Sequence, residues 1–79
     1  MYFVYILQSK QDESFYIGMT ADLKKRFAEH NNGRSKYSAT KKPFKIAWYG
    51  CFETKKKALD FERYLKSSSG FAFRNKHLI

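Results

Sequence analysis

Hydrophobic residues gather in three continuous runs that are rich in aromatic and β-branched side chains. These runs predict β-strands over Tyr2–Gln8, Phe15–Met19 and Phe44–Phe52. In the first run, both sets of alternating side chains are apolar, so we expect this strand to be central and covered on both faces. The polar segment Ser9–Ser14 predicts a hairpin connection to an antiparallel second strand.

Two segments between and after these runs carry helical signals. Leu23 and Phe27 form the apolar stripe of a helix predicted over residues 21–31, with Thr20 as its expected N-cap and Asp22 in its first turn. A second stripe occurs later at i, i+3 and i+7. It consists of Ala58, Phe61 and Leu65 and predicts a helix over residues 55–66, capped by Thr54.

The segment after the second helix is rich in serine. Ser67–Gly70 is expected to break that helix, and Phe71–Leu78 to form a short final helix. The order β-β-α-β-α-(α) predicts an α/β (α+β) fold, with a small, mainly antiparallel three-stranded sheet flanked by helices. We expect residues 1–79 to form a single domain, because a chain of this length supports one core.

The charge of the chain changes this picture more than its apolar content does. Sixteen Lys and Arg residues face seven Asp and Glu residues, which gives a formal net charge of +9. This excess favours a polyanionic partner, nucleic acid first and an anionic membrane surface second. Solubility alone is the competing explanation, although +9 exceeds the charge of about 2–8 that suits a small soluble domain.

Cysteine content and hydropathy bear on the compartment. Cys51 is the only cysteine of the chain, so an internal disulfide is excluded and a reducing compartment is expected, with the thiol packed in a strand. The apolar run at the N-terminus is too short for a signal peptide, and no run approaches the length of a membrane span. We therefore expect a cytoplasmic protein without membrane association.

Candidate chemistry begins with two tyrosines in the first two predicted strands. Tyr5 and Tyr16 lie in neighbouring strands of the predicted hairpin, so their rings can be close in space. Cross-strand aromatic packing explains such a pair without any function. Gly18 within the second strand indicates close approach by another backbone or by a ligand.

The predicted helices contribute charged groups. Arg26 and His30 are spaced i, i+4 and share one face at the edge of the apolar stripe, although a solvated basic helix is an equal alternative. Glu62 falls on the inward side of the second helix, where a carboxylate needs a partner. That partner is either a Lys or Arg in an ion pair or a metal ion. One carboxylate with phosphate oxygens and waters is an ordinary Mg²⁺ arrangement, and a two-metal site is not indicated.

Taken in order, these residues resemble the GIY-YIG nuclease family over nearly the whole chain. The pattern is Phe3-Val4-Tyr5, ten residues, Tyr16-Ile17-Gly18, then Thr20, Leu23, Arg26, His30, Asn31, Glu62 and Asn75. The chain looks most like small stand-alone bacterial members, which are related to the nuclease domain of the excision-repair endonuclease UvrC and to homing endonucleases. One departure is that Phe3-Val4-Tyr5 stands where the family has Gly-Ile-Tyr.

The resemblance implies a metal-dependent endonuclease that hydrolyses DNA to 5′-phosphate and 3′-hydroxyl ends, with Mg²⁺ or Mn²⁺ as cofactor. It implies one groove lined by Tyr5, Tyr16, Arg26, His30 and Glu62 and supported by Asn75. In that groove Glu62 would hold the metal ion, and Arg26 would stabilise charge on the phosphate. Tyr5 is the expected base with Tyr16 beside it, and His30 would hold the tyrosine or take its proton.

Basic residues elsewhere are the expected contacts to the nucleic acid backbone. They are Arg34, Lys36, Lys41 and Lys42 of a loop that also holds Tyr37, and Lys55, Lys56, Lys57 and Lys66 of the second predicted helix. Tyr37 could stack on an unpaired base. A solvated first helical turn is the competing explanation for the three consecutive lysines.

Three functions therefore stay open. The first is an endonuclease of DNA repair or processing, with low sequence specificity or a preference for a DNA shape. The second is a non-catalytic nucleic-acid-binding module of the same fold, with RNA as well as DNA as a candidate ligand. The third is a subunit that docks on a repair complex through the apolar residues of its C-terminal end, with packing of these residues on the domain's own sheet as the competing explanation. They are Phe71, Phe73, Leu78 and Ile79.

Overall fold

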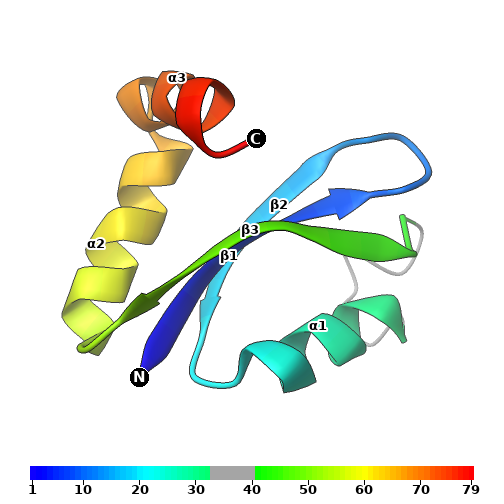
Figure 1. The fold of residues 1–79 in the computed structure, drawn as a ribbon, viewed down its shortest axis with the longest axis horizontal. Helices are drawn as coiled ribbons and strands as arrows, with labels where there is room; N and C mark the ends of the chain where they lie inside the picture. The colour runs from blue at the N-terminus through cyan, green and yellow to red at the C-terminus, as the bar shows by residue number, and fades with distance from the viewer. Residues whose placement is uncertain (33–40) are drawn as a thin grey trace.

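A three-stranded antiparallel sheet with helices on both faces forms the molecule (Figure 1). The computed structural model describes residues 1–32 and 41–79. In chain order the elements are β1 (Tyr2–Ser9), β2 (Phe15–Thr20), α1 (Leu23–Asn31), β3 (Phe44–Phe52), α2 (Lys55–Lys66) and α3 (Ser68–His77). The strand order is β2-β1-β3, which confirms the predicted fold class and the central position of the first strand.

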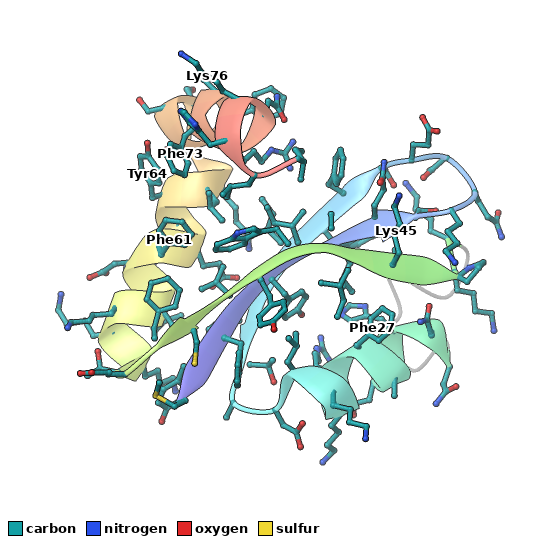
Figure 2. The ribbon with its side chains drawn as sticks, viewed as in Figure 1. Phe27, Lys45, Phe61, Tyr64, Phe73 and Lys76 are labelled. Atoms are coloured by element: carbon teal, nitrogen blue, oxygen red, sulfur yellow. The ribbon has the colours of Figure 1, made fainter. Side chains whose placement is uncertain are left out.

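The alternating apolar residues of β1 supply two separate cores. Val4 and Ile6 are fully buried with Ala58 and Leu65 of α2. Tyr5 and Leu7 point to the other face, where they form a second cluster with Phe44. Leu23 and Phe27 of α1 pack against this second cluster, and Figure 2 shows Phe27 directed from α1 toward the sheet.

The register of the hairpin fixes which side chains meet across β1 and β2. Tyr5 is paired with Gly18, and Phe3 with Thr20. The connection is held by the Ser9 amide, which donates to the Ser14 carbonyl at 2.9 Å. Glu13 has a φ of 63°, the left-handed conformation that lets the tight turn close.

The start of α1 differs from the predicted one. Thr20 is not the N-cap, because it remains in β2 and is paired with Phe3. Asp22 caps the helix instead, since its side chain accepts a hydrogen bond from the Lys25 amide at 3.1 Å. The Thr20 hydroxyl accepts from the Asp22 amide at 3.1 Å and so turns the chain from the strand into the cap.

The final helix begins three residues earlier than predicted. Only Ser67 separates α2 from α3, and its hydroxyl accepts from the Gly70 amide at 3.2 Å as an N-cap. A Cβ on Gly70 would lie 2.7 Å from the Leu65 Cα and even closer to the Tyr64 carbonyl. Gly70 is therefore a residue of the first turn of α3 that permits this helix to pack closely on α2, and not a helix breaker.

Two further expectations concern the packing of Cys51 and membrane-spanning helices. Cys51 lies in β3, as expected, but it is exposed and not packed. Within the described residues, no helix has the length and apolar character to cross a membrane.

Candidate functional site

A pocket of about 410 Å³ opens along β2, between α1 and α2. Its lining comes from both strands of the hairpin and from both helices. The lining residues are Tyr5, Tyr16, Ile17, Gly18, Met19, Thr20, Arg26, His30 and Glu62. All five residues predicted to line one groove are therefore brought together, and whether they act in catalysis stays a prediction.

Tyr5 occupies the floor of this pocket because of the hairpin register. It lies opposite Gly18, and a Cβ on Gly18 would be 2.5 Å from the Tyr5 Cζ. Any side chain at this position would collide with the phenol ring. The group that approaches Gly18 is thus the Tyr5 side chain, and not the backbone or ligand that the sequence led us to expect.

The Tyr5 hydroxyl is held between two residues of α1. The Arg26 Nε donates a hydrogen bond to the Tyr5 Oη at 3.4 Å. The His30 Nε2 lies 3.3 Å from the same oxygen, and the direction of that hydrogen bond depends on the histidine tautomer. The i, i+4 spacing on one helical face places both groups on one oxygen.

His30 is almost completely buried and tends to be neutral. Burial lowers the pKa of His30 below its usual range, and the neighbouring Arg26 charge lowers that pKa further. The Nδ1 atom of His30 is buried and finds no hydrogen-bond partner among the described residues. A neutral imidazole next to a phenol can accept a proton from that phenol.

Arg26 keeps its charge and part of its exposure. The hydrogen bond to Tyr5 is the largest cause that raises the pKa of Arg26, and an ion pair with Glu29 at 3.6 Å adds to it. The Arg26 side chain is 40% exposed. Its guanidinium can therefore reach an incoming anion while its Nε holds Tyr5.

Tyr16 completes the α1 side of the pocket. Its ring centre is 6.3 Å from that of His30 and 5.3 Å from that of Phe44, the latter in an edge-to-face arrangement. Tyr16 thus packs on the histidine that Tyr5 contacts, which agrees with both readings of the tyrosine pair, packing and chemistry.

Glu62 reaches the pocket from the opposite helix. Its side chain is only 17% exposed, and its Oε2 accepts a hydrogen bond from the Lys66 Nζ at 3.0 Å. The ion pair and the position in the pocket are thus both present. Among the described residues, no group of three or more His, Cys, Asp or Glu could hold a metal ion by itself. The residues fit a site in which the protein supplies one carboxylate and phosphate oxygens and waters supply the rest.

One predicted residue stands apart, and other lining residues were not anticipated. Asn75 is exposed on α3 and does not line the pocket. Met19 and Thr20 line the pocket, although neither carries a chemical signal in the sequence. Met19 directly follows Gly18 in the predicted strand, which is the one feature that could have indicated its position, whereas Thr20 was expected outside that strand as a helix cap.

The basic residues predicted to bind nucleic acid have varied surroundings. Lys41 forms an ion pair with Asp12 at 3.1 Å, and Lys66 pairs with Glu62. The three lysines of the first turn of α2, Lys55, Lys56 and Lys57, are exposed, and so is Lys42. Within that turn, Lys56 pairs with Asp60 at 3.0 Å. The remaining predicted contacts, Arg34, Lys36 and Tyr37, lie outside the described residues.

The chain is similar to proteins of one family in sequence and in structure. A family model described as the GIY-YIG catalytic domain matches residues 1–76. A UPF0213 protein of Clostridium perfringens is 45% identical over 67 residues, covering 84% of this chain and 71% of that protein. A UPF0213 protein of Haloquadratum walsbyi is 39% identical over 67 residues, covering 84% and 74%. The solution NMR structure of a UPF0213 protein from Bacillus halodurans aligns with a TM-score of 0.58 and 31% identity, covering 96% of this chain and 84% of that one.

Proposed function

The chain belongs to the GIY-YIG family, a family of nucleases, and on this premise we propose that it is a divalent-metal-dependent endonuclease that hydrolyses DNA. The observation that carries the proposal is the Tyr5 hydroxyl, which is held by Arg26 and His30 in a pocket that Glu62 also lines. The net charge of +9 supports a polyanionic substrate. The proposed role is in DNA repair or processing, with residues 1–79 acting as one nuclease domain.

Tyr5 and His30 form the proposed base. As the attacking water gives a proton to the Tyr5 oxygen, the phenol proton passes to the His30 Nε2 at 3.3 Å. The lowered pKa of His30 keeps the imidazole neutral and able to accept that proton near pH 7. Tyr16 packs on His30 and keeps its ring in place.

Arg26 and Glu62 act on the phosphate in this proposal. The exposed part of the Arg26 guanidinium binds a phosphate oxygen and stabilises the charge that develops on it. Glu62 would hold Mg²⁺ or Mn²⁺, which when bound supplies positive charge to a phosphate oxygen and to the leaving 3′-oxygen. Lys66, which pairs with Glu62 here, has to release the carboxylate for that role.

The test compares Glu62→Ala with Asp60→Ala, an exposed carboxylate two residues earlier in α2. Supercoiled plasmid and branched, flapped and single-stranded oligonucleotides are incubated with Mg²⁺, Mn²⁺ or EDTA. We expect Glu62→Ala to lose about 100-fold or more of the cleavage rate, because the charge of a metal ion is worth several kcal/mol. Asp60→Ala is expected to cut like the wild type. Full cleavage by Glu62→Ala would rule the mechanism out.

A nucleic-acid-binding module without turnover is the second candidate. The ion pair of Glu62 with Lys66 favours it, because a carboxylate that is already neutralised needs no metal ion. In the same assay this candidate gives salt-sensitive binding without metal-dependent cleavage.

A further inference from the structure

An exposed aromatic ring on α3 takes no part in the proposed nuclease chemistry. Phe71 is 54% exposed, and Arg74 follows it by three residues, so the two side chains share one helical face. The Arg74 Cζ lies 4.5 Å from the Phe71 ring centre and 5.2 Å from the Phe15 ring centre. Both distances are within the range of a cation–π contact.

Arg74 is fixed by these rings more than by hydrogen bonds. Its Nε is buried and has no hydrogen-bond partner among the described residues. The contact to Phe15 anchors the guanidinium on β2, and the contact to Phe71 supports the inner side of an exposed ring. The ring is thus supported from behind, as a stacking surface has to be.

Arg74 lies beside the first residue of β2, the strand along which the pocket opens. Phe15 and Ile17 pack on the same face of β2, the one that faces α2, and Ile17 lines the pocket. With a rise of about 3.3 Å per strand residue, Phe15 lies about 10 Å along β2 from Gly18. A nucleic acid strand that leaves the pocket toward the hairpin therefore passes the side of the sheet where Arg74 and Phe71 lie.

The local charge favours a nucleic acid over an apolar protein partner. Arg74, Lys76 and His77 fall in the last turn of α3, and Figure 2 shows Lys76 projecting outward from the helix. An exposed ring among cations, in a chain with a net charge of +9, suits a ligand that has both flat bases and phosphates. A purely apolar partner would leave these charges uncompensated.

We propose that Phe71, supported by Arg74, is a stacking platform for an unpaired base of the strand that enters the pocket. This inference rests on the proposed nuclease function and narrows its substrate to DNA with unpaired bases next to the cleaved bond, such as a flap or a gap. Stacking on an aromatic ring is tolerant of base identity, so the platform selects for single-stranded character and not for sequence. In a blunt duplex the bases are stacked on one another and are not available to Phe71.

The binding experiment compares Phe71→Ala with Tyr49→Ala, because both rings are 54% exposed and Tyr49 lies on β3, the opposite edge of the sheet. Fluorescence anisotropy in EDTA measures the affinity for a single strand, a flap and a blunt duplex of matched length. We expect Phe71→Ala to weaken binding of the single strand and the flap by about 5- to 150-fold and to leave the duplex affinity unchanged. Tyr49→Ala is expected to bind all three like the wild type.

Two conservative variants separate stacking from folding. Phe71→Trp is expected to keep or increase the affinity for the flap, and Phe71→Leu to lose it, although Leu retains the apolar volume. Circular dichroism checks that both remain folded. A 2-aminopurine in the unpaired segment is expected to be quenched by the wild type and by Phe71→Trp only.

Equal flap affinity for Phe71→Leu, Tyr49→Ala and the wild type would overturn the inference, as would an equal loss on flap and duplex. Either result leaves the nuclease proposal standing, since cleavage and its dependence on Glu62 are measured separately. If the wild type binds and cuts no nucleic acid, both proposals fail.

Discussion

The side chains on the two faces of β1 have different surroundings, apolar on one face and partly polar on the other. On the α2 face, Val4 and Ile6 meet Ala58 and Leu65, and all four are apolar and essentially inaccessible to solvent. On the α1 face, Tyr5 is also buried, but its hydroxyl contacts a guanidinium and an imidazole. Alternation along one strand thus separates a face that stabilises the fold from a face that holds reactive groups.

The difference has a thermodynamic consequence. Burying apolar surface stabilises by about 25 cal/mol per Å², whereas a buried polar atom without a partner is destabilising. The α1 face contains such an atom, the His30 Nδ1, in its interior, whereas the second such atom among the described residues, the Arg74 Nε, belongs to α3 and lies outside the apolar cluster of the α2 face. We infer that the α2 face provides most of the stability of the fold. The α1 face contributes less, because it buries polar groups at a cost in folding free energy.

The largest effect is expected where α3 packs on α2. Gly70→Ala would force a methyl group into the backbone of α2, which cannot move as a side chain can. We expect a loss of about 3 kcal/mol or more in the free energy of unfolding, at the upper end of overpacking effects. Urea unfolding measures it, with Ser69→Ala at the preceding exposed position as control. Equal midpoints for the two variants would contradict this account of the α2 face.

A second glycine, Gly18, tests the α1 face, where an added methyl group would collide with a side chain and not with backbone. Gly18→Ala meets the end of the Tyr5 side chain, which can shift away. We expect a smaller loss of stability, about 1–3 kcal/mol, together with a loss of cleavage because the Tyr5 hydroxyl leaves Arg26 and His30. A double-mutant cycle with Tyr5→Leu measures the coupling in urea. Additive effects of the two substitutions would show that the ring and the glycine do not compete for the same space.

Much of the α2 face could be predicted from the sequence. The run Tyr2–Gln8 is apolar on both alternating sides, which is consistent only with a central strand, and the stripe of α2 follows helical spacing. The ends of the helices could not be predicted as well. Thr20 is a good capping residue, but pairing with Phe3 kept it in the sheet and left the capping to Asp22. At Thr20, pairing with the neighbouring strand therefore outweighed the local preference of threonine for a helix cap.

The pocket could be predicted in outline but not in its contacts. The i, i+4 spacing placed Arg26 and His30 on one face of a helix, and the structure confirms that arrangement. That both contact the oxygen of Tyr5 depends on the register between β1 and β2, which no local pattern specifies. The pairing of Glu62 with Lys66 was one of two open alternatives, and the supporting role expected of Asn75, which does not line the pocket, stays a prediction.

A smaller effect should appear in the pH dependence of stability. Because the pKa of folded His30 lies below its usual range, the unfolded chain binds a proton at this histidine more readily than the folded one. The stability contributed by neutral His30 is therefore complete above about pH 6.5 and is lost as the pH falls toward the lower pKa. We expect the unfolding free energy of the wild type to fall more steeply between pH 7 and pH 5 than that of His30→Gln.

Urea unfolding at several pH values measures this slope, and His77→Gln, at an exposed position of α3, controls for the loss of a histidine. Parallel curves for the wild type and His30→Gln would show that burial of the imidazole does not affect its protonation.

The smallest effect concerns two ion pairs of α2 that share the i, i+4 spacing. The Lys56–Asp60 pair is largely exposed, whereas Glu62 in the Lys66 pair is 17% exposed and lines the pocket. We expect Lys56→Met and Lys66→Met each to change stability by no more than about 0.5 kcal/mol, which is typical of helical ion pairs. They should differ in metal binding, because Lys66→Met leaves the Glu62 carboxylate without its positive neighbour. A Mn²⁺ titration followed by calorimetry should then show tighter binding to Lys66→Met than to Lys56→Met. Equal affinities would indicate that Glu62 is part of the structural face of α2 and not of the pocket chemistry.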